Sequence, residues 1–178
     1  MVLLTSSSVP MKKTRSGTRS DVYMAGYELT LQGVLAAALW KNGLRQKLIG
    51  GFKVNYENGY TISVSGNDIF VSDGDVYVVG FENNVARLWK NGVVQELIVD
   101  ASKPSSASGG YVSGDDVYVT GSKTWKNGHV LYGHEGGSGN SIFVSEGDIY
   151  VAGKQGHDAV VWKNGVAQEL PGRDGGGD

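Results

Sequence analysis

Short apolar runs alternate with turns rich in Gly, Asp and Asn along most of the chain. Val76-Tyr-Val-Val and Ile149-Tyr-Val-Ala combine β-branched with aromatic residues, with Asp before and Gly after each run. This composition is typical of β-strands. The segment 31–39 comes closest to helical spacing, but it continues directly into Trp-Lys-Asn-Gly, so we interpret it as a strand. The pattern predicts an all-β chain.

The expected strands belong to a repeat whose parts keep a constant order. Trp-Lys-Asn-Gly accounts for every tryptophan in the chain and begins at Trp40, Trp89, Trp125 and Trp162. A second motif, Asp-(Val/Ile)-Tyr-(Val/Met)-x-Gly, precedes each copy and begins at Asp21, Asp75, Asp116 and Asp148. A further apolar run precedes the second motif, best seen at 68–74 and 141–147. The repeat therefore predicts one supersecondary unit used four times.

Turn signals divide each repeat into strands. Asn-Gly between two apolar runs is a strong hairpin signal, and Asp and Gly at 72–75, 113–116 and 145–148 are typical of tight turns. The order of strands and turns predicts a four-stranded antiparallel meander of roughly 35–45 residues, the size of a β-propeller blade. One meander cannot bury both of its faces, so we expect neighbouring blades to stack. Each tryptophan is then expected to pack between adjacent blades.

The expected architecture is a β-propeller-like array of about four four-stranded antiparallel blades. The first blade has no convincing first strand, because residues 12–20 are polar and basic. The array is expected to be a small ring or a fragment of a larger propeller; length favours the ring, and an incomplete ring would make oligomerisation possible. The expected boundaries are a flexible basic segment at 1–20, a repeat domain at 21–170 with blades at 21–50, 61–99, 110–133 and 139–170, and a flexible Gly-rich tail at 171–178.

The two motifs together resemble a family of bacterial repeat proteins with β-propeller-like blades. The segments Ala86-Arg-Leu-Trp-Lys-Asn-Gly and Ala159-Val-Val-Trp-Lys-Asn-Gly carry the resemblance best, and it extends from about Asp21 to Leu170. It implies a propeller fold and, since many members are extracytoplasmic, a place outside the cytoplasm. The family is largely of unknown function, so the resemblance supplies no catalytic residues.

Composition narrows the function classes. The 178 residues include 28 Gly and no Cys, which excludes a disulfide scaffold and thiolate metal sites. A net charge of −2 argues against nucleic acid as a partner, because a general nucleic-acid binder normally has a basic face. No apolar stretch approaches the roughly 20 residues of a membrane-spanning helix. The short apolar run after Met1 and the basic residues that follow it do not match a secretory signal.

Few residues suggest chemistry. The three histidines, His129, His134 and His157, fall in expected loops and are interpreted as surface residues. Pairs of carboxylates in the tight turns resemble fragments of calcium-binding loops, but their recurrence at one place in the repeat favours a role in forming the turn. The run 101–110, rich in Ser, Ala and Gly, is interpreted as a loop between blades or a flexible linker. No metal or cofactor is expected.

The positions after the glycine of the second motif are the candidate binding site. They hold Tyr27 and Glu28 in the first repeat and Phe81 and Glu82 in the second, whereas Lys123 and Lys154 occupy this region in the third and fourth. We expect these positions to be loops that line one face of the array. An aromatic ring beside a carboxylate suits recognition of a sugar or a cation. No catalytic residue is assigned.

The sequence therefore favours a non-enzymatic binding or scaffolding repeat module whose unknown ligand is a carbohydrate or a protein. One alternative is a hydrolase or lyase with its site at the channel mouth, because a propeller can bring together carboxylates from distant blades. A second alternative is a truncated repeat fragment without independent function. The weak first strand and the short third repeat motivate the second alternative.

Overall fold

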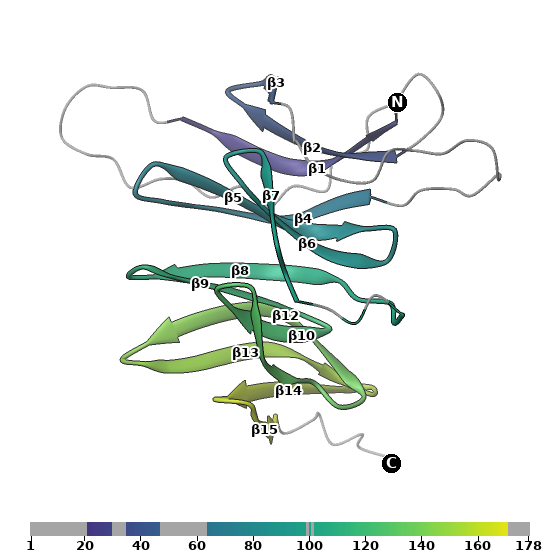
Figure 1. Ribbon diagram of the computed structural model, residues 1–178. Helices are drawn as coiled ribbons and strands as arrows, with labels where there is room; N and C mark the ends of the chain where they lie inside the picture. Colours follow the sequence, from purple (N-terminus) through teal and green to yellow (C-terminus); the bar gives the residue numbers. More distant parts are fainter. Residues whose placement is uncertain (1–20, 30–34, 47–63, 99, 101, 171–178) are drawn as a thin grey trace, which may run out of the picture.

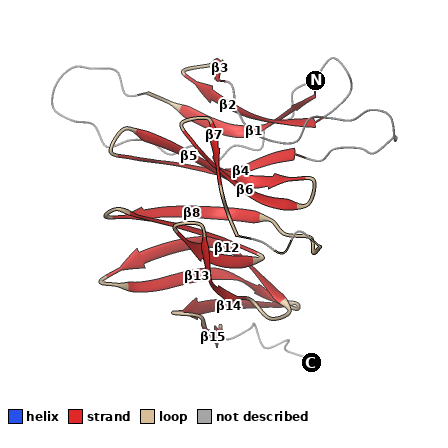
Figure 2. Cartoon of the chain, viewed as in Figure 1, coloured by secondary structure: helices blue, strands red, loops and turns tan. Residues whose placement is uncertain are grey.

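The computed structural model describes residues 21–29, 35–46, 64–98, 100 and 102–170 (Figure 1). All of the regular secondary structure in these residues is β-strand, as Figure 2 shows. The prediction of an all-β chain is confirmed. The expected flexible segments 1–20 and 171–178 lie outside the described residues.

The described strands form four antiparallel sheets, each a meander of consecutive strands. The first sheet contains β1 (Tyr23–Leu29), β2 (Leu35–Lys41) and β3 (Leu44–Gln46). The second contains β4 (Val64–Ser72), β5 (Asp75–Glu82), β6 (Val85–Lys90) and β7 (Val93–Gln95). The third contains β8 (Ala107–Ser113), β9 (Asp116–Gly121), β10 (Lys123–Lys126) and β11 (His129–Gly133). The fourth contains β12 (Gly137–Ser145), β13 (Asp148–Gln155), β14 (Asp158–Lys163) and β15 (Val166–Glu169).

The four sheets stack in a row, with the first sheet at one end and the fourth at the other (Figure 1). Neighbouring sheets meet mainly through the leading strand of each later sheet: β4 contacts β1 and β8, and β8 contacts β12. The array of blades is thus confirmed, but the described strands form an open row and not the four-bladed ring that chain length favoured. Because each sheet stacks on the one before it, the outer faces of the first and fourth sheets lie at opposite ends of the row.

Asparagine and glycine form the tight turns as the sequence predicts. In the four Trp-Lys-Asn-Gly hairpins, the Asn has a φ of 50–52° and the following Gly a φ of 79–83°. Two successive residues with positive φ are typical of a type I′ hairpin turn. Asn83 and Asn84, with φ of 51° and 60°, form the β5–β6 turn in the same way. The strands therefore extend to the turn, so Tyr27, Glu28, Phe81 and Glu82 lie in strands and the prediction that they lie in loops is wrong.

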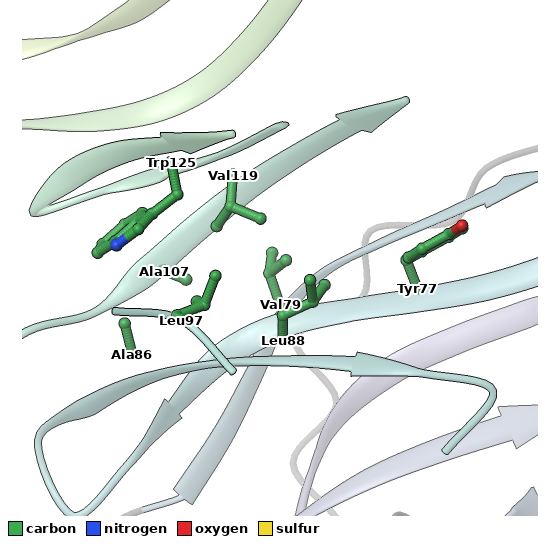
Figure 3. Close-up of a cluster of buried hydrophobic side chains, with 8 residues drawn as sticks. All are labelled: Tyr77, Val79, Ala86, Leu88, Leu97, Ala107, Val119 and Trp125. Carbon is green, nitrogen blue, oxygen red and sulfur yellow. The ribbon is translucent and has the colours of Figure 1, made fainter. Parts of the chain in front are cut away.

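Buried tryptophans fill the spaces between the sheets. Trp125, on β10, has no exposed surface, and its Nε1 donates a hydrogen bond to the backbone oxygen of Ile98 at 2.9 Å. Figure 3 shows its cluster, which joins the second and third sheets and consists of Tyr77, Val79, Ala86, Leu88, Leu97, Ala107, Val119 and Trp125. Trp89 packs in the same way between the first and second sheets, and Trp162 between the third and fourth. The predicted position of the tryptophans between blades is confirmed for these three.

Candidate functional site

A repeated cluster of four polar side chains, which we call the aspartate clamp, occurs once in each sheet. In the second sheet, Asp75 Oδ2 lies 2.7 Å from Lys90 Nζ, and Asp75 Oδ1 accepts a hydrogen bond of 2.7 Å from Asn91 Nδ2. Asn91 Oδ1 in turn accepts a bond from the backbone nitrogen of Val76, and Lys90 Nζ lies 5.4 Å from the ring centroid of Tyr77. The equivalent clamps are Asp21–Tyr23–Lys41–Asn42, Asp116–Tyr118–Lys126–Asn127 and Asp148–Tyr150–Lys163–Asn164.

Strand register brings the clamp together. Tyr77 pairs with Lys90 across β5 and β6, so the start of one strand meets the turn at the end of the next. The hydrogen bond from Lys90 lowers the pKa of Asp75 below its ordinary value of 3.8, and the same bond raises the pKa of Lys90. The aspartates therefore link two hairpins and do more than form their own turns. No cluster of three or more His, Cys, Asp or Glu side chains suited to a metal occurs in the described part of the chain.

We expect the clamps to make stability fall in acid. Each clamp aspartate has a lowered pKa in the folded protein, so its contribution is complete above the unfolded pKa of about 3.8 and is lost as the pH falls through the folded pKa. Replacing Asp75, Asp116 and Asp148 together by Asn should lower the thermal midpoint at neutral pH and flatten its decline below pH 3.8. Thermal melts across this pH range measure the effect. Asp115→Asn is the matched control because Asp115 lies beside a clamp but outside it, and an equal flattening in this variant would contradict the account.

An open hollow of about 220 Å³ lies at the edge where the second and third sheets meet. Six residues line it: Phe81, Asn84, Pro104, Ser105, Ser106 and Ser122. The lining is one aromatic ring, a proline, a side-chain amide and three hydroxyl side chains, and it carries no charge. The sequence placed Phe81 at a binding position but gave 104–106 only the role of a loop or linker.

Hydrogen bonds fix the walls of the hollow. The Ser105 nitrogen donates to the backbone oxygen of Asn84 at 2.6 Å, and the Ala86 nitrogen donates to Ser105 Oγ at 3.0 Å. The Ser122 nitrogen donates to the backbone oxygen of Ser106 at 3.0 Å. The segment that crosses between the second and third sheets is therefore tied to the β5–β6 turn and to β9–β10. The interpretation of 101–110 as a loop or flexible linker is wrong for residues 107–110, because they belong to β8.

The structure separates the two members of the predicted Phe81–Glu82 pair. Phe81 and Glu82 are consecutive residues of β5, so their side chains point to opposite faces of the second sheet. Phe81 lines the hollow. Glu82 is only 7% exposed, and its Oε2 lies 3.2 Å from Arg87 Nε. Tyr27 lies half-buried on β1, and the side chain of Glu28 lies outside the described residues. Of the three candidates whose side chains are described, Phe81 is the one that lines the hollow.

The structure corrects the interpretation of His134 as a surface residue. Its side chain is buried between the third and fourth sheets, where Nε2 lies 3.1 Å from Thr124 Oγ1 and 3.3 Å from Thr120 Oγ1. The centroid of the imidazole ring lies 4.4 Å from that of the Trp162 ring. Burial lowers the pKa of His134. Room for the ring exists because Thr124 stands where the second sheet has the larger Leu88. At 6% exposure, His134 cannot act as an accessible catalytic base.

The comparisons with known proteins add no functional assignment. No protein-family model matches this sequence, and neither a curated protein nor a solved structure matches it. Within the described residues, no helix is long and apolar enough to cross a membrane.

Proposed function

We propose that the protein is a non-enzymatic binding module and that the hollow between the second and third sheets binds an uncharged, hydroxyl-rich ligand such as a sugar ring. The observation that carries this proposal is the lining of the hollow. Phe81 offers an aromatic surface to the C–H face of a sugar, while Asn84 and the serines offer neutral hydrogen-bonding groups to its hydroxyls. Such a combination of an apolar surface with a few placed polar groups is typical of small-molecule sites.

The placement of the charged residues favours binding over catalysis. The recurring aspartates and lysines are engaged with each other in the clamps, and Glu82 is buried beside Arg87. A hydrolase or lyase would need acid and base groups that converge on an accessible surface. The residues that line the hollow include no carboxylate and no histidine. Turnover of a bound saccharide would nevertheless favour the catalytic alternative.

The two asparagines of the β5–β6 turn allow a matched test. Asn84→Gly removes a side-chain amide from the hollow, and glycine accepts the positive φ of 60° without strain. Asn83→Gly makes the same change one residue earlier, where the side chain does not line the hollow. Chemical shifts of the protein are followed by NMR during titration with a panel of neutral mono- and oligosaccharides.

We expect a saccharide from the panel to shift the signals of residues around the hollow. Asn84→Gly should weaken that binding about 2- to 10-fold, which corresponds to one hydrogen bond of about 0.5–1.5 kcal/mol. Phe81→Ala should abolish the shifts, and Asn83→Gly should leave the affinity unchanged. The proposal fails if no saccharide shifts these signals, or if the two Asn→Gly variants behave alike.

A further inference from the structure

We infer that the outer face of the fourth sheet is a docking surface for the first sheet of a second copy of this chain, so that copies join head to tail. This outer face carries Ala152 and Val161 and points away from the third sheet. The inference is independent of the proposed ligand. It rests on the way in which each sheet of the row covers the one before it.

One row of equivalent positions shows the pattern. In the first three repeats, the residue just before the glycine of the Asp-(Val/Ile)-Tyr-(Val/Met)-x-Gly motif faces the next sheet and is covered by it. Ala25 is 4% exposed, and Val79 and Thr120 have no exposed surface. The equivalent Ala152 is exposed. The fourth sheet therefore presents an uncovered copy of a surface that is covered in every other sheet.

The neighbouring row behaves in the same way. The residue before each repeat tryptophan is 4% exposed at Leu39, 5% at Leu88 and 0% at Thr124, whereas Val161 is only partly buried. An apolar pair on two neighbouring strands of the fourth sheet, Ala152 on β13 and Val161 on β14, is thus left accessible.

Polar groups at the edge of this face also match an internal interface. In β4, Asn67 Nδ2 donates to the backbone oxygen of Ala107 at 2.8 Å, and Asp68 Oδ2 accepts a bond of 3.1 Å from the Gly110 nitrogen. These two bonds tie the second sheet to the leading strand of the third. The equivalent residues of β12, Asn140 and Ser141, are exposed. The fourth sheet thus presents both the apolar and the polar elements of a sheet-to-sheet contact.

The first sheet carries the complementary surface. Trp89, Trp125 and Trp162 each pack against the preceding sheet and are at most 3% exposed. Trp40 belongs to the first sheet, which no described sheet precedes, and it is only half-buried. Val22 lies on the same face by strand alternation and is 54% exposed. The second copy would therefore place Trp40 and Val22 against the row of Tyr150 and Ala152.

Contact between two different surfaces of identical chains is heterologous, so the two surfaces can be blocked separately. Ala152→Arg places a charge on the outer face of the fourth sheet, and Val22→Arg places one on the outer face of the first. Ala167→Arg is the matched control, because Ala167 is exposed on the same sheet but pairs with Trp162 and so belongs to the opposite face. Masses are measured by light scattering after size exclusion, from micromolar to near-millimolar protein.

We expect the wild-type chain and Ala167→Arg to form species heavier than the 18.9 kDa monomer, and each of the other two variants to be monomeric. Mixing Ala152→Arg with Val22→Arg should restore a 1:1 dimer, because one intact surface of each kind remains. A wild-type mass of 18.9 kDa at all concentrations overturns the inference. It is also overturned if the Ala152→Arg variant has the same solution mass as the wild-type chain, or if the two variants stay monomeric when they are mixed.

Discussion

Replacing Trp125 by alanine should lower the free energy of unfolding by about 3–5 kcal/mol, the range for removing a large buried aromatic side chain. The indole has no exposed surface and packs in the cluster between the second and third sheets (Figure 3). Alanine would leave a cavity there and would also leave the Ile98 oxygen without its hydrogen bond. Urea unfolding followed by circular dichroism measures the change.

The other tryptophans extend this prediction. Trp89 is 1% exposed, so Trp89→Ala should also cost about 3–5 kcal/mol. Trp40 is the control within the same motif, because it is only half-buried, and Trp40→Ala should cost less than half as much. If Trp125→Ala or Trp89→Ala changed the free energy of unfolding by less than about 1 kcal/mol, the tryptophans would not be packed between sheets.

Replacing Gly80 by alanine should destabilise the protein by roughly 3 kcal/mol, the upper part of the range for an overpacked core. A β-bulge at Asn67 shifts the register between β4 and β5 and brings the Ser65 backbone over Gly80. A Cβ at Gly80 would lie 1.8 Å from the Ser65 oxygen. Because this neighbour is backbone and not the end of a flexible side chain, β4 itself would have to move.

The glycine that ends the Asp-(Val/Ile)-Tyr-(Val/Met)-x-Gly motif lies similarly close to the neighbouring backbone in two other sheets. A Cβ at Gly121 would lie 2.0 Å from the Ser106 oxygen, and one at Gly153 would lie 2.1 Å from the Ser138 oxygen. Gly133→Ala is the control, since nothing lies within 4 Å of its Cβ position and its φ is not positive. Thermal midpoints compare the two variants. Equal midpoints for Gly80→Ala and Gly133→Ala would show that the close approach to Ser65 is not present.

The repeat motifs predicted most of the fold because they act locally. Asn-Gly readily adopts the two successive positive φ values of a type I′ turn. The short runs of β-branched and aromatic residues between these turns indicate the strands. The choice between a ring and a row could not be predicted, because it depends on the angle between stacked sheets, which no single repeat encodes. The sequence also indicated a turn role for the clamp aspartates. The bonds of these aspartates to Lys and Asn form only when β5 pairs with β6 or when the equivalent strands pair. The sequence did hold a signal for these bonds, because the Asp of one motif and the Lys-Asn of the other recur together in every repeat.

The candidate site was predicted only in part, for similar reasons. Phe81 was identified, but its assignment to a loop hid the fact that Glu82 faces the other side of the sheet. The low-complexity run gave no sign that Ser105 and Ser106 line the hollow. Its small residues have a structural reason in Gly109 and Gly110, whose Cβ positions would lie 2.8 Å from the Asn140 oxygen and 1.9 Å from the Phe70 ring. Contacts of this kind arise only when the sheets stack.

Hydrogen exchange of the four tryptophan indole N–H groups, measured by NMR, tests the stacked row most directly. Exchange requires exposure, and the local free energy of opening limits it where the group is buried. We predict that the Trp125 indole exchanges slowest, because it is fully buried and bonded to Ile98, that Trp89 and Trp162 are also protected, and that Trp40 exchanges fastest. Fast exchange of all four indoles, or slower exchange at Trp40 than at Trp125, would contradict the stacking of each sheet on the one before it.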